Sequence, residues 1–258
     1  MPPLSDNMKR MERALTIVTG GSRGIGAATV LALARVGHDV VFSYRSDSDA
    51  AERVRTIATE QGTRCIAVQA EVTDQGGVAR LFGEAAEIGS PTGLVNNAGL
   101  TAHIGDLADT PVEVIRNVID VNLIGVVLCA REAIRAMSTR RRGRGGAIVN
   151  ISSAAATLGS PHEYVHYAAA KAGVEALTVG LAKEVADDGI RVNAVSPGIV
   201  NTDIHAAAGA PDRAERVVSR IPMGRLAEPD EIAPAIVWLL GPEAAYTSGA
   251  VIRVAGGV

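Results

Sequence analysis

The stretch YVHYAAAK at residues 164–171 holds two tyrosines ahead of one lysine, residue types that together can move a proton. In a helix, which turns about 100° and rises about 1.5 Å per residue, Tyr167 and Lys171 are neighbours on one face because they stand at i and i+4. Tyr164 lies about 10 Å from Lys171 along the axis. A positive charge lowers the pKa of tyrosine from its free value of about 10 and suits it to general acid/base catalysis. The spacing predicts Tyr167 as the acid/base and Lys171 as the group that tunes it; the alternative is a core tyrosine beside a solvated lysine.

A glycine-rich turn, TGGSRGIG at residues 19–26, follows the first apolar run of the chain. Glycines allow a sharp turn and a close approach to a diphosphate, and the N-terminal amides of the next helix favour its negative charge. The spacing of Gly20, Gly24 and Gly26 departs from the pattern G-x-G-x-x-G, and a turn that needs glycine only for its backbone is the alternative. The turn alone is weak evidence for a dinucleotide site, so other motifs of the sequence must support it.

Apolar runs alternate with helical patterns from Ala14 to the end of the chain. The predicted strands are 14–20, 38–44, 64–72, 92–99, 145–153, 189–198 and 250–254. The predicted helices run from the glycine turn to Val36 and over 47–61, 74–88, 111–137, 164–187 and 228–240. Strands that are apolar on both faces predict a doubly wound parallel sheet of about seven strands with helices on both sides. The site is expected beyond the carboxyl ends of these strands.

Length, charge and cysteine content narrow the class of protein. The 258 residues suit one catalytic α/β domain, predicted over 14–258, after a flexible tail over 1–13. The net charge of −3 gives no reason to expect a nucleic-acid partner, and the basic run 140–146 is read as an exposed loop. Cys65 and Cys129 stand in apolar stretches and are predicted to be buried thiols, with a disulfide or a metal site as the alternative. Without a membrane-length apolar run or a signal peptide, a cytoplasmic protein that holds no metal is expected.

Five further motifs stand in order after the glycine turn. They are NNAG at 96–99, Asn122, ISS at 151–153, YAAAK at 167–171 and PGIVNT at 197–202. Together with the turn pattern T-G-x-x-x-G-x-G, they resemble the short-chain dehydrogenase/reductase family over nearly the whole chain after Ala14. Within that family, the chain looks most like the bacterial branch of glucose dehydrogenases and 3-oxoacyl-acyl-carrier-protein reductases. The resemblance implies a single-domain Rossmann-type fold and an NAD(P)-dependent oxidoreductase that acts on a carbonyl or a secondary alcohol.

The resemblance also implies the catalytic residues Asn122, Ser153, Tyr167 and Lys171. Ser153 stands 14 residues before Tyr167 and Ser152 stands 15, and the shorter spacing usual in the family favours Ser153 as the group that holds the substrate oxygen. Ser152 is expected to bond backbone or cofactor nearby. The matching asparagine of the family interrupts its helix and holds a water that leads to the lysine; a satisfied structural asparagine is the alternative for Asn122.

Cofactor residues follow from the same resemblance. They form the glycine turn, the adenosine end and its wall, and the segment at the nicotinamide end: Gly20, Ser22, Arg23, Gly24, Ile25, Gly26, Tyr44, Arg45, Glu71, Val72, Asn97, Ala98, Gly99, Pro197, Gly198, Val200 and Thr202. Glu71 stands where the family usually has an aspartate that contacts the adenine. Asn96 is expected, with Ala98 and Gly99, to shape the wall beside the ribose and to stabilise the central sheet.

The end of the second predicted strand, VVFSYRSDS, bears on the choice of cofactor. NAD-binding folds tend to place an acid there, on the ribose 2′-hydroxyl, whereas NADP-binding folds place an arginine nearby. Tyr44 takes the place of the acid, Arg45 follows it, and Arg23 stands in the glycine turn. Two guanidinium groups can clamp a 2′-phosphate, which favours NADP(H) over NAD(H). The alternative is that both arginines are simply solvated and bind no phosphate. Asp47 and Asp49 are close enough in sequence to weaken the argument for a phosphate site.

Residues 203–225 match the segment that covers the substrate in the family, and small residues around Gly209 suggest a mobile lid. His205 either faces the substrate or is solvated, and Tyr164 either lines the pocket or packs in the core. A sugar, a 3-oxoacyl group or a small ketone fits the resemblance, which also implies a homo-oligomer, a tetramer or a dimer. A dinucleotide-binding sensor or scaffold with little turnover is the rival function, and a nucleic-acid binder that uses 140–146 is a remote third.

Overall fold

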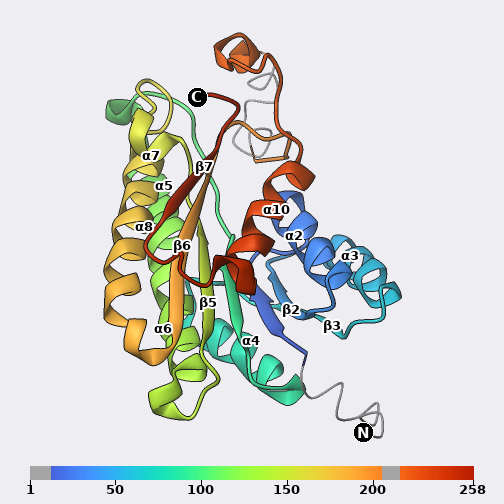
Figure 1. Cartoon of the computed structure of the whole chain (residues 1–258). Coiled ribbons are helices and arrows are strands. Elements are labelled where there is room, and N and C mark those ends of the chain that lie inside the picture. The colour runs from blue at the N-terminus through green and yellow to red at the C-terminus, as the bar shows by residue number, and fades with distance from the viewer. Residues whose placement is uncertain (1–12, 205–215) are drawn as a thin grey trace, which may run out of the picture.

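A sheet of seven parallel strands forms the centre of the computed structural model, which describes residues 13–204 and 216–258 (Figure 1). The strands are β1 (Leu15–Val18), β2 (Asp39–Tyr44), β3 (Cys65–Gln69), β4 (Gly93–Asn96), β5 (Gly146–Ile151), β6 (Ile190–Pro197) and β7 (Val251–Val254). Their order is β3-β2-β1-β4-β5-β6-β7, and every pairing is parallel. The order reverses between β1 and β4, where such sheets bind ligands. The predicted doubly wound fold is confirmed.

Helices cover both faces of this sheet (Figure 1). One layer consists of α2 (Gly24–Arg35), α3 (Ser48–Glu60) and α10 (Pro229–Leu240), and the other of α4 (Gln75–Ile88), α6 (Gly125–Met137) and α8 (Val165–Glu184). The shorter α5 (Val112–Ile119) and α7 (Ala155–Leu158) contact α8. Single 3-10 turns occur at η1 (Leu107–Asp109), η3 (Thr139–Arg141), η4 (Ala186–Asp188), η6 (Val218–Arg220) and η7 (Pro242–Ala244).

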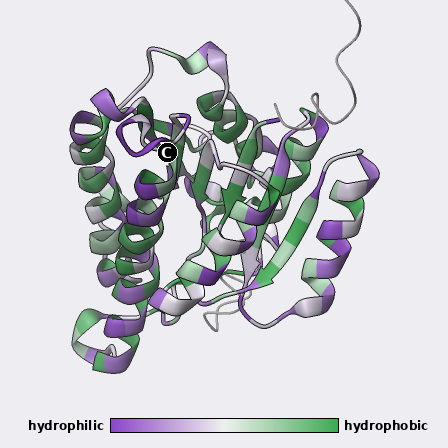
Figure 2. Ribbon diagram, turned by 90° about the horizontal axis from the view of Figure 1, so that it is seen from below, coloured by the Kyte–Doolittle hydropathy of each residue, from purple (hydrophilic) through white to green (hydrophobic). Residues whose placement is uncertain are grey.

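The strands are apolar on both faces because each face meets a layer of helices. Ile17 of β1 packs against the layer of α4, α6 and α8, whereas its neighbour Val18 packs against the layer of α2, α3 and α10. In Figure 2 the central strands are mainly green, and purple residues lie on the outer turns of the helices. A strand buried on both sides keeps its register, so the loops beyond its end are held in place.

The predicted helix over 111–137 is interrupted in the structure. α5 ends at Ile119, one turn of π-helix, η2 (Asp120–Ile124), follows, and α6 continues from Gly125. Asn122 lies in this turn and is fully buried, at the place where the family resemblance implied an interruption. Turns of π-helix occur frequently at functional sites.

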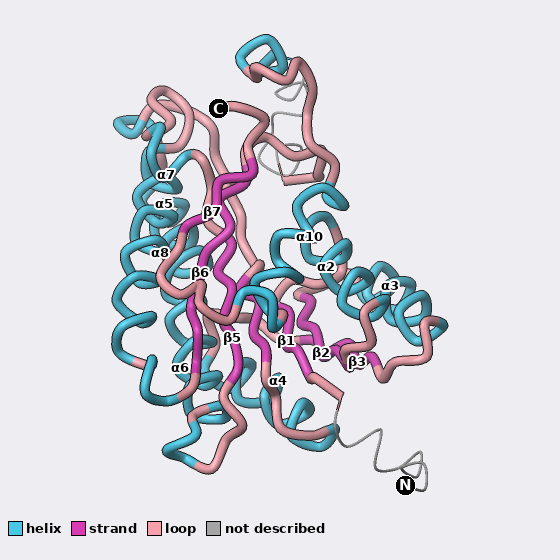
Figure 3. Tube along the Cα trace, viewed as in Figure 1, coloured by secondary structure: helices cyan, strands magenta, loops and turns pink. Residues whose placement is uncertain are grey.

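The loops that follow the strands gather at one end of the sheet, the upper end in Figure 3. The helix α7 at this end was not predicted, because its four residues are too few to show a helical pattern. Part of the predicted lid, residues 205–215 with His205 and Gly209, lies outside the described residues, as does the predicted tail up to residue 12.

Both cysteines are free and buried, which confirms the prediction from their apolar surroundings. Burial raises the pKa of the Cys65 thiol and of the Cys129 thiol to about 12. Within residues 13–204 and 216–258, no helix combines the length and the apolar character that a membrane span requires.

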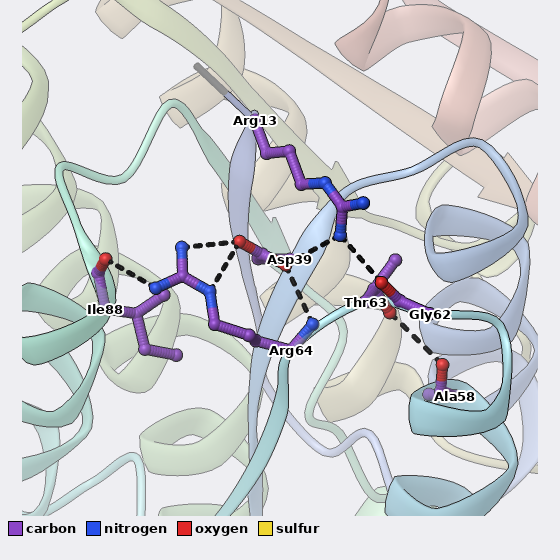
Figure 4. Close-up of polar contacts among 7 residues, drawn as sticks. All are labelled: Arg13, Asp39, Ala58, Gly62, Thr63, Arg64 and Ile88. Atoms are coloured by element: carbon purple, nitrogen blue, oxygen red, sulfur yellow. Dashed lines mark hydrogen bonds and ion pairs between the residues drawn. The ribbon is translucent and has the colours of Figure 1, made fainter. Parts of the chain in front are cut away.

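A buried carboxylate joins three strands at the opposite end of the sheet (Figure 4). The side chain of Asp39, the first residue of β2, is 1% exposed. Arg64 donates to Oδ2 from Nε at 2.9 Å and from Nη2 at 2.6 Å, and its backbone N–H donates to Oδ1 at 2.8 Å. Nη1 of Arg13 lies 3.8 Å from Oδ1 and donates to the Gly62 carbonyl. Asp39 therefore connects the beginnings of β1, β2 and β3.

Replacing Asp39 with asparagine should lower the free energy of unfolding by about 2–4 kcal/mol, because charge-assisted hydrogen bonds are lost and an amide N–H faces a guanidinium. Urea denaturation followed by circular dichroism measures this loss. As a control, Glu52→Gln breaks an exposed i,i+3 pair with Arg55 and should leave the midpoint nearly unchanged. Equal midpoints for Asp39→Asn and the wild type would contradict the role given to this cluster.

Candidate active site

A groove of about 670 Å³ runs across the carboxyl ends of the strands. Three of the four predicted catalytic residues line it, namely Ser153, Tyr167 and Lys171. The predicted cofactor residues also line it, with the exception of Gly26, which lies beneath the glycine turn. Asn122 is the predicted catalytic residue that does not reach the groove wall. The fold thus brings together residues that are up to about 180 positions apart in the chain.

The glycine turn has the shape that a diphosphate requires. Gly20 and Gly24 have φ values of +66° and +54°, which side chains other than glycine rarely adopt. A Cβ at Gly26 would lie 2.1 Å from the Gly20 carbonyl oxygen, so the close packing of turn and helix depends on this glycine. Arg23 provides no side-chain cap for α2, which leaves the first amides of the helix available to an anion. The turn therefore fits a dinucleotide diphosphate.

Thr19, which the sequence reasoning did not single out, holds the wall formed by the loop after β4. Its hydroxyl oxygen accepts from the backbone N–H groups of Asn97 and Ala98, each at 3.0 Å. Asn97 Nδ2 donates in turn to the carbonyl oxygens of Thr19 and Gly20, each at 3.0 Å. The wall and the glycine turn are therefore one hydrogen-bonded unit. The threonine of the T-G pair was the signal in the sequence.

Asn96 stabilises the sheet, as expected, but it does not line the groove. It is 2% exposed, and its Nδ2 donates to Asn150 Oδ1 at 2.9 Å. Asn150 Nδ2 donates to Thr178 Oγ1 at 2.9 Å. These buried bonds connect β4, β5 and α8 directly below the groove.

The part of the groove beside the end of β2, where adenosine is expected from the sequence, contains two exposed arginines, Arg23 and Arg45. Neither forms an ion pair with another described residue. Asp47, which could have neutralised them, instead caps α3 by accepting from the Ala50 N–H at 2.9 Å. Glu71 lines the same end, and its Oε1 accepts from the Val72 N–H at 3.1 Å.

Tyr167 and Lys171 meet in the buried part of the groove. They are 8% and 3% exposed, and Lys171 Nζ lies 5.7 Å from the centre of the Tyr167 ring. Nζ also donates to the Ile151 carbonyl at 2.8 Å, at the end of β5. Burial lowers the pKa of Lys171 from 10.5 to about 8. A buried lysine with a lowered pKa is unusual and is typical of functional sites.

Tyr164 both lines the groove and packs in a small apolar cluster, so the two alternatives for it hold together. Its ring meets that of Tyr167 edge to face, with centroids 5.2 Å apart and planes at 82°. Such a contact restrains the Tyr167 ring. His166, a buried neighbour that sequence reasoning did not assign, has a pKa lowered by burial and by His103.

Both serines after β5 line the groove, but their hydroxyl groups have different partners. The Ser153 hydroxyl oxygen accepts from the Ala155 N–H at 3.2 Å. Ser152 Oγ donates to Glu175 Oε1 at 2.7 Å and lies 3.4 Å from the Lys171 carbonyl oxygen. The backbone contact of Ser152 was expected, whereas Glu175 was missed because nothing in the local sequence marks it.

Asn122 holds the wall of the groove from behind. Its Nδ2 donates to the Leu100 carbonyl at 2.7 Å and to the Val118 carbonyl at 2.8 Å, and its Oδ1 accepts from the Leu100 N–H at 3.3 Å. A Cβ at Gly99 would lie 2.8 Å from this Oδ1 and 3.6 Å from Lys171 Nζ. The amide group is therefore satisfied, and it fixes the loop that borders the ammonium.

The end of β6 and the segment after it form another part of the groove wall. The lining residues here are Pro197, Gly198, Val200 and Thr202. The Gly198 N–H donates to the Val254 carbonyl at 3.0 Å, which ties this segment to β7. Apolar side chains line the adjoining part of the groove: Leu100, Ala102, Leu158, Ile204 and Val217.

Comparison with known proteins agrees with this geometry. The family model described as enoyl-(acyl carrier protein) reductase matches residues 20–258. The oxidoreductase YgfF of Escherichia coli (strain K12) is 45% identical over 95% of this chain and 99% of its own length. A cis-4-hydroxycyclohexanecarboxylate dehydrogenase of Sinomonas cyclohexanicum is 41% identical, over 94% and 95%. A 3-oxoacyl-[acyl-carrier-protein] reductase of Synechocystis sp. is 40% identical, over 97% and 99%.

Solved structures show the same likeness. The short-chain dehydrogenase/reductase from Serratia marcescens BCRC 10948 superposes with a TM-score of 0.87 at 31% identity and covers 96% of this chain and 98% of its own. A blue fluorescent protein from a metagenomic library, solved in complex with NADPH, gives a TM-score of 0.86 at 31% identity with the same coverage. The chain therefore belongs to the short-chain dehydrogenase/reductase family, whose members bind NAD(P), and it is an oxidoreductase.

Proposed function

We propose that the chain is an NADP(H)-dependent carbonyl reductase or alcohol dehydrogenase that uses Tyr167 as its general acid/base. The observation that carries this proposal is the burial of Lys171 beside Tyr167, in the groove that contains the glycine turn. Burying an ammonium costs free energy, and ionisable groups perturbed in this way are found most often at functional sites.

Each residue of the site has a part in the proposed reaction. A bound nicotinamide dinucleotide supplies or accepts the hydride. During reduction, Tyr167 donates its phenolic proton to the carbonyl oxygen while the Ser153 hydroxyl hydrogen-bonds that oxygen as charge develops on it. Lys171 favours the phenolate that remains. Asn122 keeps the loop at Gly99 beside the ammonium through its bonds to Leu100.

The lining of the groove favours some of the substrates that the family accepts over others. The apolar lining beyond Tyr164 suits a hydrocarbon portion next to the carbonyl. The names of the relatives include a dehydrogenase of a cyclic alcohol and a reductase of a carrier-bound 3-oxoacyl group. Small ketones and 3-oxoacyl esters are therefore the first substrates to test, followed by sugars.

The test is an assay of NADPH oxidation with a panel of ketones, aldehydes, diketones and 3-oxoacyl esters, and of NADP reduction with the matching alcohols and sugars. The proposal expects turnover with at least one of these substrate classes. Tight binding of NADPH without turnover in either direction on any member would contradict it and favour a dinucleotide sensor.

The preference for NADP(H) is supported by Arg23 and Arg45 at the expected adenosine end, which form no ion pair with any residue that the structure describes. Arg45 is fixed through its backbone, because its carbonyl accepts from Gln69 Nε2 at 3.0 Å. Arg23 lies at the start of α2 on the same groove. A 2′-phosphate between the two guanidinium groups would gain charge-assisted hydrogen bonds that a 2′-hydroxyl cannot match.

Arg45→Ala should weaken NADPH binding by about 10- to 100-fold, the equivalent of roughly 1.5–3 kcal/mol for hydrogen bonds to a charged group. NADH binding should be nearly unchanged, because it lacks the phosphate. Fluorescence titration of the reduced cofactors measures both, with the exposed Arg53 of α3 replaced by alanine as the control. Equal affinity of the wild type for NADH and NADPH, or an Arg45→Ala variant that keeps its NADPH affinity, would contradict the preference.

We also propose a homo-oligomer and a cytoplasmic location. The oligomer is supported by exposed apolar side chains on the long helices and the last strand, among them Val127 on α6, Val179 on α8, Trp238 on α10 and Val251 on β7. Light scattering of the purified protein tests the assembly. A monomer at micromolar concentration would contradict it.

A further inference from the structure

The residue before the proposed catalytic serine is tied to the helix that carries the other catalytic groups. Ser152 Oγ donates to Glu175 Oε1 at 2.7 Å, and the Lys171 carbonyl oxygen lies 3.4 Å from the same hydroxyl. Ser152 is 2% exposed, and its backbone N–H donates to the Val195 carbonyl on β6 at 2.8 Å. The turn at the end of β5 is therefore held by the sheet on one side and by α8 on the other.

Both chain neighbours of Ser152 belong to the proposed site. The Ile151 carbonyl accepts the hydrogen bond from Lys171 Nζ at 2.8 Å, and Ser153 lines the groove together with Tyr167. A rotation of the turn at Ser152 would move the acceptor that holds the ammonium and the hydroxyl that meets the substrate oxygen. Misplacing such groups by about 1 Å costs roughly 100-fold in rate.

Glu175 stands on the same stripe of α8 as Tyr167 and Lys171, because the three residues are spaced at i, i+4 and i+8. It is half-buried, and no described arginine, lysine or histidine forms an ion pair with it. Its carboxylate is the short-range acceptor for the buried Ser152 hydroxyl, whose other contact, with the Lys171 carbonyl, is 3.4 Å long. Loss of this acceptor would leave the buried hydroxyl poorly paired and free to turn.

We propose that Glu175 is a positioning residue that, through Ser152, sets the place of the Ser153 hydroxyl and of the Ile151 carbonyl that holds Lys171. This inference rests on the proposed function. It assigns the task to the acceptor oxygen of Glu175 and not to its charge.

Two variants of Glu175 separate position from charge. Glu175→Ala removes the acceptor and should lower kcat by about 10- to 100-fold on the best substrate of the panel, with the NADPH dissociation constant unchanged. Glu175→Gln keeps an acceptor oxygen and should restore kcat to within about threefold of the wild type, with an unshifted pH profile. Glu184→Ala, an exposed position at the end of the same helix, is the matched control.

A double-mutant cycle tests the route through Ser152. Ser152→Ala should lower kcat as well, and the double variant with Glu175→Ala should lose clearly less than the product of the two single effects. Urea midpoints within the range of the Glu184→Ala control show that folding is intact. The inference is overturned if Glu175→Ala keeps the wild-type kcat, if Glu175→Gln loses as much as Glu175→Ala, or if the two effects multiply. A wild-type chain without turnover would instead count against the proposed function.

Discussion

Tyr167→Phe should lose about 100- to 10,000-fold in kcat while it binds NADPH as the wild type does. The phenylalanine keeps the ring, which is 8% exposed and packs edge to face with Tyr164, so the groove should keep its shape. The variant lacks only the hydroxyl that exchanges the proton with the substrate. Steady-state kinetics and fluorescence titration of NADPH separate the two effects.

The matched control is Tyr164→Phe, which also removes one phenolic hydroxyl from the groove. It should lose far less activity, because Tyr164 stands seven residues from Lys171 and its contact with Tyr167 is made by the ring. Turnover that survives in Tyr167→Phe and disappears in Tyr164→Phe would show that the acid/base had been assigned to the wrong tyrosine.

Lys171→Met should have the next largest effect, a fall of about 100-fold in alcohol oxidation at pH 7. Oxidation needs the Tyr167 phenolate, and without the ammonium the pKa of the tyrosine returns toward its free value of about 10. The acid limb of the pH profile should therefore move to higher pH, with part of the rate recovered in alkaline buffer. The exposed Lys183, on the last turn of α8, serves as the control when it is replaced by methionine. A pH profile that Lys171→Met leaves in place would contradict the tuning role.

The same lysine links stability to pH. The pKa of Lys171 is about 8 in the folded protein, whereas a solvated lysine, as in the unfolded chain, has a pKa of 10.5. The unfolded chain therefore binds the proton more tightly. Burial of the charge therefore opposes folding below pH 8, and this cost disappears as the pH rises toward 10.5. The unfolding free energy of the wild type, relative to Lys171→Met, should increase by up to about 3 kcal/mol across that window. A constant difference would mean that the ammonium is solvated.

The fold could be predicted from the sequence because its signals are local and repeated. Short apolar runs, such as LTIV of β1, which is buried at every position, alternate with helices in which apolar and polar residues recur at helical spacing. The short helix α7 and the break at η2 were exceptions. At η2 the sequence pattern predicts one continuous helix, and only the family resemblance implied an interruption at Asn122.

The site was predictable where a motif lies in one segment. The glycine turn and the pair of Tyr167 and Lys171 are of this kind. Ser152 and Glu175, by contrast, are 23 positions apart, and their hydrogen bond depends on how α8 packs against β5 and β6. Asn96 and Asn150, which are 54 positions apart, are joined in the same way. Contacts of this kind leave no spacing in the chain that could reveal them.

The most direct measurement of the central claim is the transfer of deuterium from NADPH labelled at C4 to the carbonyl carbon of a panel substrate. The account predicts one deuterium on the carbinol carbon of the product when the transferred position is labelled, found by mass spectrometry, with the hydroxyl proton drawn from solvent. Tyr167→Phe should yield almost none of this product in the same time. A product without deuterium from either labelled face of the cofactor, or equal product from the two proteins, would contradict the account.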